Sequence, residues 1–97
     1  MTNVENKFKL ITESKYEPTL EESQEFVGGY GEGITFPNGD YLIINEEGKL
    51  RNLPLNEIAT GLWRETFTKD KYAFGYDDFV VGPAILIKAN ALKRWAA

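Results

Sequence analysis

The sequence contains no cysteine and no histidine among its 97 residues. Without cysteine there are no disulfide bonds, thiolate metal ligands or thiol nucleophiles, as suits a reducing cytosol. Without histidine there is no histidine general base, no serine triad of the usual kind and almost no route to a zinc site. Carboxylate pairs, lysine and tyrosine remain as catalytic groups. We therefore expect a protein that is not an enzyme, with no catalytic residue, no cofactor and no metal.

Long apolar segments and excess positive charge are also missing. No apolar run approaches the roughly 18 residues that span a bilayer, and the first residues lack the regions of a signal peptide. Eleven basic against fifteen acidic residues give a net charge of −4, which disfavours direct nucleic-acid binding. We expect a cytoplasmic protein, with no membrane contact, that forms a single domain over residues 1–97.

The chain is rich in aromatic and acidic residues. Aromatics make up 13% of a short chain with a thin core, so some of them should lie on a contact surface, and self-association is one outcome. The segment from residue 13 to residue 32 contains six acidic residues and a single basic one, Lys15. These acids are Glu13, Glu17, Glu21, Glu22, Glu25 and Glu32. They form either a docking surface for a basic partner or a solvated helix face.

A short helix is predicted after Pro18. Thr19 is followed three positions later by Glu22, which is the spacing of a reciprocal capping box. The glycine pair at 28 and 29 can end the helix in the left-handed conformation. The predicted inner face of this helix carries Leu20 and Val27.

A β-hairpin is predicted around the segment 36–41, FPNGDY, because Asn-Gly favours a two-residue type I′ turn. In that register Phe36 faces Tyr41 and Ile34 faces Ile43. A second turn at 46–49 and a short strand at 50–53 would continue the hairpin into a meander.

Three further elements follow from periodicity. Residues 7–12 and 84–87 are predicted strands, the latter preceded by a bend at Gly82-Pro83, with 79–81 also strand-like. A helix is predicted from Leu55, because apolar residues recur at helical spacing, and residues 90–95 should form one or two helical turns. The helical stripe comprises Leu55, Ile58, Ala59, Leu62 and Trp63. The fold class is α+β, a small antiparallel sheet with two or three short helices packed on one face.

Two ligand-site hypotheses are less favoured. The glycine-rich segment 28–33 suggests an anion-binding nest, but it follows a helix and lacks the lysine of a P-loop. Close packing of another backbone or a side chain against Gly31 and Gly33 is the favoured interpretation. Asp77 and Asp78 could hold Mg²⁺ or Ca²⁺, but solvated loop acids are favoured, because no metal-loop spacing supports the site.

Four motifs, in order, carry a family resemblance: EFVGGY at 25–30, PNG at 37–39 with NEEGK at 45–49, LPLNEIAT at 53–60, and VVGPAILI at 80–87. Over about two-thirds of its length the chain resembles the family known as domain of unknown function 3846, small domains common in phages and bacterial mobile elements. The resemblance brings no catalytic residues to carry over. It implies a phage-type accessory protein, and Gly31-Glu32-Gly33 departs from the larger residues that similar sequences place there.

Two functions from different classes follow. The preferred one is a non-catalytic accessory protein that binds and blocks a host protein, with antiviral defence as one target. The alternative is an oligomeric protein that sequesters a small nucleotide-like ligand between subunits. By residue type, the candidate surface residues for a partner or ligand are Glu21, Glu22, Glu25, Tyr30, Glu32, Tyr41, Arg51, Arg64, Tyr72 and Tyr76.

Overall fold

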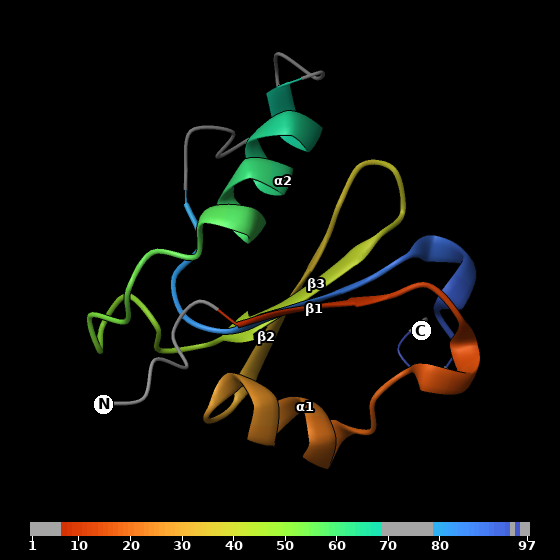
Figure 1. The fold of residues 1–97 in the computed structure, drawn as a ribbon, viewed down its shortest axis with the longest axis horizontal. Coiled ribbons are helices and arrows are strands. Elements are labelled where there is room, and N and C mark those ends of the chain that lie inside the picture. The colour runs from red at the N-terminus through yellow and green to blue at the C-terminus, as the bar shows by residue number, and fades with distance from the viewer. Residues whose placement is uncertain (1–6, 69–78, 94, 96–97) are drawn as a thin grey trace.

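One four-stranded sheet with two α-helices packed on it forms the computed structural model, which describes residues 7–68, 79–93 and 95 (Figure 1). The strands are β1 (Phe8–Ile11), β2 (Gly31–Thr35), β3 (Tyr41–Asn45) and β4 (Ala84–Ile87). The helices are α1 (Leu20–Val27) and α2 (Glu57–Thr68), with 3₁₀ turns η1 (Ser14–Tyr16) and η2 (Ala89–Ala91). The predicted α+β class is confirmed, and no described helix is long and apolar enough to cross a membrane.

The strands follow the order β1-β4-β3-β2. The pairs β2–β3 and β3–β4 are antiparallel, whereas β1 lies parallel to β4, with Phe8 opposite Ala84. The sheet is therefore mixed, and the prediction of a purely antiparallel meander was wrong. Local sequence patterns identify strands, but they carry no signal for the pairing of two strands at opposite ends of a chain.

The helices cover opposite faces of the sheet, which corrects the prediction that they share one face (Figure 1). The physical reason lies in β4, whose four residues are all buried. Ala84 and Leu86 point into a cluster with α2, and Ile85 and Ile87 point into a cluster with α1. A strand that is apolar on both sides requires cover on both sides.

Two apolar clusters therefore form the core. The α2-side cluster is made by Phe36, Leu42, Ala59, Trp63, Val80, Ala84 and Leu86. The α1-side cluster is made by Ile11, Val27, Ile43, Ile85, Ile87 and Ala91. In the first, the rings of Phe36 and Trp63 meet edge to face with centroids 6.1 Å apart, a favourable arrangement for aromatic pairs.

The hairpin forms where it was predicted, but its register differs by one residue. Thr35 lies opposite Tyr41 and Ile34 opposite Leu42, because the loop has three residues, 37–39, instead of two. The Phe36 carbonyl accepts from the Gly39 N–H at 2.9 Å, and Gly39 has φ 95°. Proline before the Asn-Gly pair favours a type I turn closed by a left-handed glycine. The shift places Tyr41 and Ile43 toward α1, and Ile34 and Phe36 toward α2.

Helix α1 begins and ends as the sequence predicts. The Thr19 hydroxyl accepts from the Glu22 N–H at 3.1 Å, the Glu22 carboxylate accepts from the Thr19 N–H at 2.9 Å, and Gly28 ends the helix at φ 86°. Val27 is buried, but Leu20 is 59% exposed and does not belong to the inner face. Leu20 is the first helical residue, so the side chain precedes the part of α1 that packs on the sheet.

Residues 46–52 form consecutive turns, so the predicted strand at 50–53 was wrong. The Leu53 N–H donates to the Gly48 carbonyl at 2.9 Å, and Asn52 has φ 56°, which is incompatible with a strand. Of the strand-like residues 79–81, only Val81 makes a bridge, to Leu55. The predicted bend at Gly82 is confirmed at φ 80°.

Helix α2 is capped by a buried side chain. The Asn56 Oδ1 accepts from the Ala59 N–H at 3.1 Å, while its Nδ2 donates to the Gly82 and Lys7 carbonyls at 2.8 and 3.0 Å. Thr60, one turn later, both donates to and accepts from the Val80 backbone. These bonds join α2 to the segment that leads into β4. Of the predicted stripe, Ala59 and Trp63 are buried, whereas Leu55 and Ile58 are 45% and 57% exposed.

Candidate interaction surface

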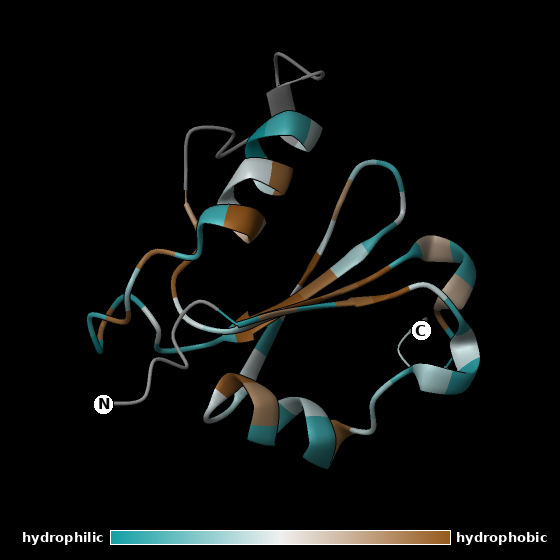
Figure 2. Cartoon of the chain, viewed as in Figure 1, coloured by the Kyte–Doolittle hydropathy of each residue, from teal (hydrophilic) through white to brown (hydrophobic). Residues whose placement is uncertain are grey.

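The acidic surface, which we define as Glu21, Glu22 and Glu25, lies on the solvent side of α1. Its carboxylates stay in water because the opposite side of the helix buries Ser23 and Val27 against the sheet. Hydrophilic residues follow the side of α1 that faces away from the strands (Figure 2). Within the described residues, no ion pair joins these three carboxylates to a lysine or arginine. The negative potential of the acidic surface is therefore directed to solvent.

Exposed apolar side chains lie around α1. Tyr16 is 63% exposed, Leu20 59% and Tyr30 73%. A depression of about 330 Å³ on one side of the helix is lined by Tyr16, Glu22 and Glu25 among others. Tyr16 therefore shares a depression with Glu22 and Glu25, whereas Leu20 and Tyr30 line a depression on the other side of the helix. Charged residues thus lie between exposed apolar side chains on both sides of α1, a mixture that is found at protein interfaces.

The aromatic recess, on the other side of α1, is a depression of about 220 Å³ lined in part by Tyr30, Tyr41 and Trp95. The rings of Tyr41 and Trp95 lie 6.1 Å apart at 34°. A Cβ on Gly33 would collide with the Tyr41 hydroxyl. The absence of a side chain at this position allows the tyrosine ring to pack against the β2 backbone. The favoured interpretation of the glycine strip as a site of close packing is confirmed at Gly33.

Trp95 is fixed by contacts with the segment before α1. Its indole N–H donates to the Pro18 carbonyl at 2.8 Å, and its backbone N–H donates to Glu17 Oε2 at 3.1 Å. The Lys93 N–H donates to both oxygens of the same buried Glu17 carboxylate. Sequence reasoning placed Glu17 in an acidic run interpreted as either a docking surface or a solvated helix face, and it did not single out Trp95.

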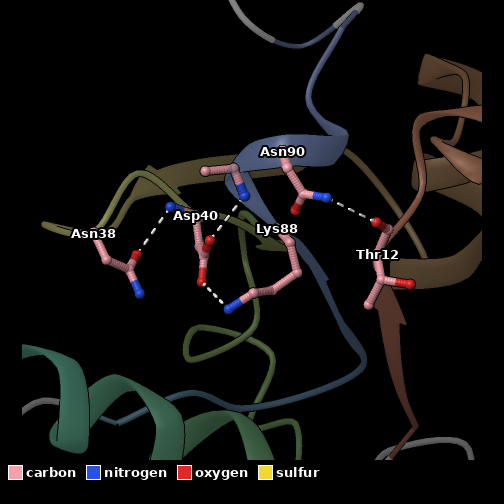
Figure 3. A network of polar contacts seen from close by, with 6 residues as sticks. Thr12, Asn38, Asp40, Lys88 and Asn90 are labelled. Atoms are coloured by element: carbon pink, nitrogen blue, oxygen red, sulfur yellow. Dashed lines mark hydrogen bonds and ion pairs between the residues drawn. The ribbon is translucent and has the colours of Figure 1, made fainter.

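A second buried carboxylate, Asp40, fixes the hairpin loop to the end of β4 (Figure 3). Asp40 accepts from the Lys88 ammonium at 2.7 Å and from the Ala89 N–H at 2.8 Å, and its own N–H donates to Asn38 at 2.9 Å. These groups also border a depression of about 460 Å³ on the α2 side of the sheet, lined by Leu62 and Glu65 from α2. Because every Asp40 oxygen has a partner, we assign this network to structure.

The structure brings together six of the ten predicted surface residues. Glu21, Glu22, Glu25, Tyr30, Tyr41 and Arg51 surround α1. The Arg51 guanidinium donates to the Gly28 carbonyl at 3.3 Å, where a cation suits the negative end of the helix dipole. Glu32 pairs across the sheet with Ile44 and so belongs to the α2 face, and Arg64 lies on α2 itself. Tyr72 and Tyr76 lie outside the described residues.

The anion-nest hypothesis for residues 28–33 loses its first two donors in the structure. The Gly28 and Gly29 N–H groups both donate to the Gln24 carbonyl, at 2.9 and 3.0 Å, and thereby close the end of α1. Among the described residues there is no group of acidic side chains arranged to hold a metal ion. Asp77 and Asp78, the other ligand-site hypothesis, lie outside the described residues.

Comparison with known proteins gives one match. Residues 3–94 match the model of a family described as Domain of unknown function (DUF3846). No curated protein and no solved structure matches the chain.

Proposed function

We propose that this chain, which belongs to the DUF3846 family of domains of unknown function, is a non-catalytic accessory protein that binds and blocks a basic host protein. The phage origin implied by the resemblance makes a bacterial protein the expected target. We expect that protein to act in antiviral defence, and binding to take place in the host cytoplasm. The acidic surface on α1 is the proposed contact.

The observation that carries this proposal is the three carboxylates on α1 without a described cationic partner, beside exposed aromatic and aliphatic side chains. Charged residues at the rim of an interface steer association with a partner of opposite sign, while large apolar side chains supply the affinity. Tyr16, Leu20 and Tyr30 are the apolar anchors in this interpretation. Binding of this kind depends on the charge and the apolar area of side chains on and around α1. It requires no catalytic group.

Affinity capture from bacterial lysates, with mass spectrometry, tests the proposal. The double variant Glu21→Lys/Glu25→Lys reverses the acidic surface and leaves the capping residue Glu22 in place. Capture should weaken at least about tenfold, because like charges then face each other. The control is Glu57→Lys/Glu65→Lys on α2, where both residues are exposed. Each Glu→Lys change raises the net charge by two, so each double variant goes from −4 to 0 and the two variants carry the same net charge. Equal loss in both variants, or no partner above background for the wild type, contradicts the proposal.

The aromatic recess favours a second candidate function, the sequestration of a small nucleotide-like ligand. Tyr30 could stack on a base beside the fixed pair of Tyr41 and Trp95. At about 220 Å³ the recess is below the 300 Å³ or so typical of ligand pockets, so a second copy of the chain would have to complete it. A nucleotide panel in a thermal-shift assay tests this, since ligand at about 100 times its Kd adds roughly 2.7 kcal/mol. Tyr30→Ala should abolish the shift, and a panel without any shift removes the candidate.

A further inference from the structure

The outer edge of β2 is an open strand edge in the described part of the chain. β2 is the last strand of the sheet, and four of its five residues are exposed. The Tyr30 carbonyl accepts from Glu46, and the Phe36 N–H donates to Asp40, so the even-numbered residues from 30 to 36 turn their backbone groups toward β3. The alternate residues Gly31, Gly33 and Thr35 therefore direct their N–H and C=O groups away from the sheet.

This edge lacks most of the features that usually prevent a strand edge from pairing, and its one charged residue is Glu32. Residues 31–35 contain no proline, no lysine and no bulge, and two of the five are glycines. The other edge strand, β1, is shorter and carries the exposed Lys9 at its second position. An unprotected edge of five residues is a template for another strand.

We propose that two copies of this chain form a dimer by antiparallel pairing of their β2 edges, with Gly33 opposite Gly33 of the partner subunit. In this register the three outward-facing residues all pair, Gly31 with Thr35 in both directions and Gly33 with itself. The pairing joins two four-stranded sheets into one of eight strands. It is independent of the partner protein proposed above.

Charge disfavours one neighbouring symmetric register, and hydrogen bonding disfavours the other. A register centred on Glu32 would place two carboxylates directly opposite each other, which is destabilising. A register centred on Ile34 leaves Gly31 beyond the pairing, opposite Pro37, which has no N–H to donate. Centring on Gly33 instead places Glu32 opposite Ile34 of the partner subunit.

A second copy of the chain is the occupant we infer, because the β2 edge is self-complementary in this register. Each outward-facing residue of one copy meets an outward-facing residue of the other, with glycine opposite glycine at the centre. The absence of side chains at Gly31 and Gly33 allows the two backbones to approach closely.

Sedimentation equilibrium with the pair Thr35→Pro and Thr35→Val tests the dimer. The wild type should approach 22 kDa, twice 11.0 kDa, as concentration rises. Proline removes the outward N–H of residue 35, an edge position that tolerates it, and so deletes two intermolecular bonds per dimer. The dimer Kd should increase at least about tenfold. Valine keeps the N–H and the branched shape, so its Kd should match that of the wild type.

Amide hydrogen exchange of the wild type decides the matter if the proline variant fails to fold. The amides of Gly31, Gly33 and Thr35 should exchange more slowly at high protein concentration than at low, while those of Glu32 and Ile34, bonded to β3, should not change. A wild type that is monomeric at all concentrations, a dimer unaffected by Thr35→Pro, or concentration-independent exchange at all three amides overturns the inference. So does a monomer that binds only foreign strand peptides.

Discussion

The two faces of the sheet differ in how their helices are held. On the α2 side, a twelve-residue helix is joined to the strands through the Trp63–Phe36 contact and the buried hydrogen bonds of Asn56 and Thr60. On the α1 side, an eight-residue helix buries only Ser23 and Val27 and begins with an exposed capping box. Isolated helices shorter than about 12–15 residues are marginal in water, so α1 depends on its caps and its few contacts.

The difference separates stability from binding. Helix α2 buries Ala59, Thr60 and Trp63, and Thr60 is bonded to the Val80 backbone inside the core, so substitutions there should act on folding. The α1 side offers carboxylates and exposed rings to solvent, so many substitutions there can change binding without unfolding the protein. Three variants of decreasing effect test this contrast.

The largest effect is expected from Trp63→Ala. The side chain is buried among Phe36, Ala59 and Val80, and truncating a buried tryptophan costs about 3–5 kcal/mol. Because the free energy of unfolding of a small domain is about 5–15 kcal/mol, this loss would remove much of the stability. Urea denaturation followed by circular dichroism measures the change in unfolding free energy. Phe26→Ala, at a half-buried position of α1, should cost about half as much, and equal losses would show that the two faces contribute alike.

A smaller effect is expected from Asn56→Ala. The change removes the cap of α2 and leaves the buried Gly82 carbonyl without its donor, for a combined loss of about 2–4 kcal/mol. Asn45→Ala is the matched comparison on the α1 side, because Asn45 is also buried and donates to the Val27 carbonyl. Asn45 caps no helix start, so its loss should be smaller. An Asn45 variant less stable than the Asn56 variant would reverse the proposed roles of the two faces.

The sequence predicted features that depend on neighbours a few positions apart. The capping box at Thr19, the left-handed end at Gly28 and the existence of the hairpin were all correct. The hairpin register was wrong because Asn-Gly was weighed without Pro37, which favours the three-residue loop. One residue of shift moves every β3 side chain to the opposite face relative to β2, so an error in one loop changed the predicted composition of both faces.

Contacts between distant positions could not be predicted. The parallel pairing of β1 with β4 and the bond from Trp95 to Pro18, 77 positions apart, leave no trace in local periodicity. The acidic residues of α1 were identified as candidate surface residues by charge density alone. Arg64 was chosen by residue type and lies on the other face, because nothing in one sequence indicates which side of a sheet a helix covers.

The smallest effect, and the one most specific to α1, is expected from Thr19→Ala. Loss of the hydroxyl that accepts from Glu22 should cost about 1 kcal/mol, within the 0.5–2 kcal/mol range for such caps. Thr19→Ser keeps an accepting oxygen and should stay within a few tenths of the wild type. Amide exchange should become faster in α1 and stay unchanged in α2, because a first-turn defect in a short helix frays that helix before the sheet. Faster exchange across both helices would mean that the faces unfold as one unit, and the division between a stable α2 side and a binding α1 side would then fail.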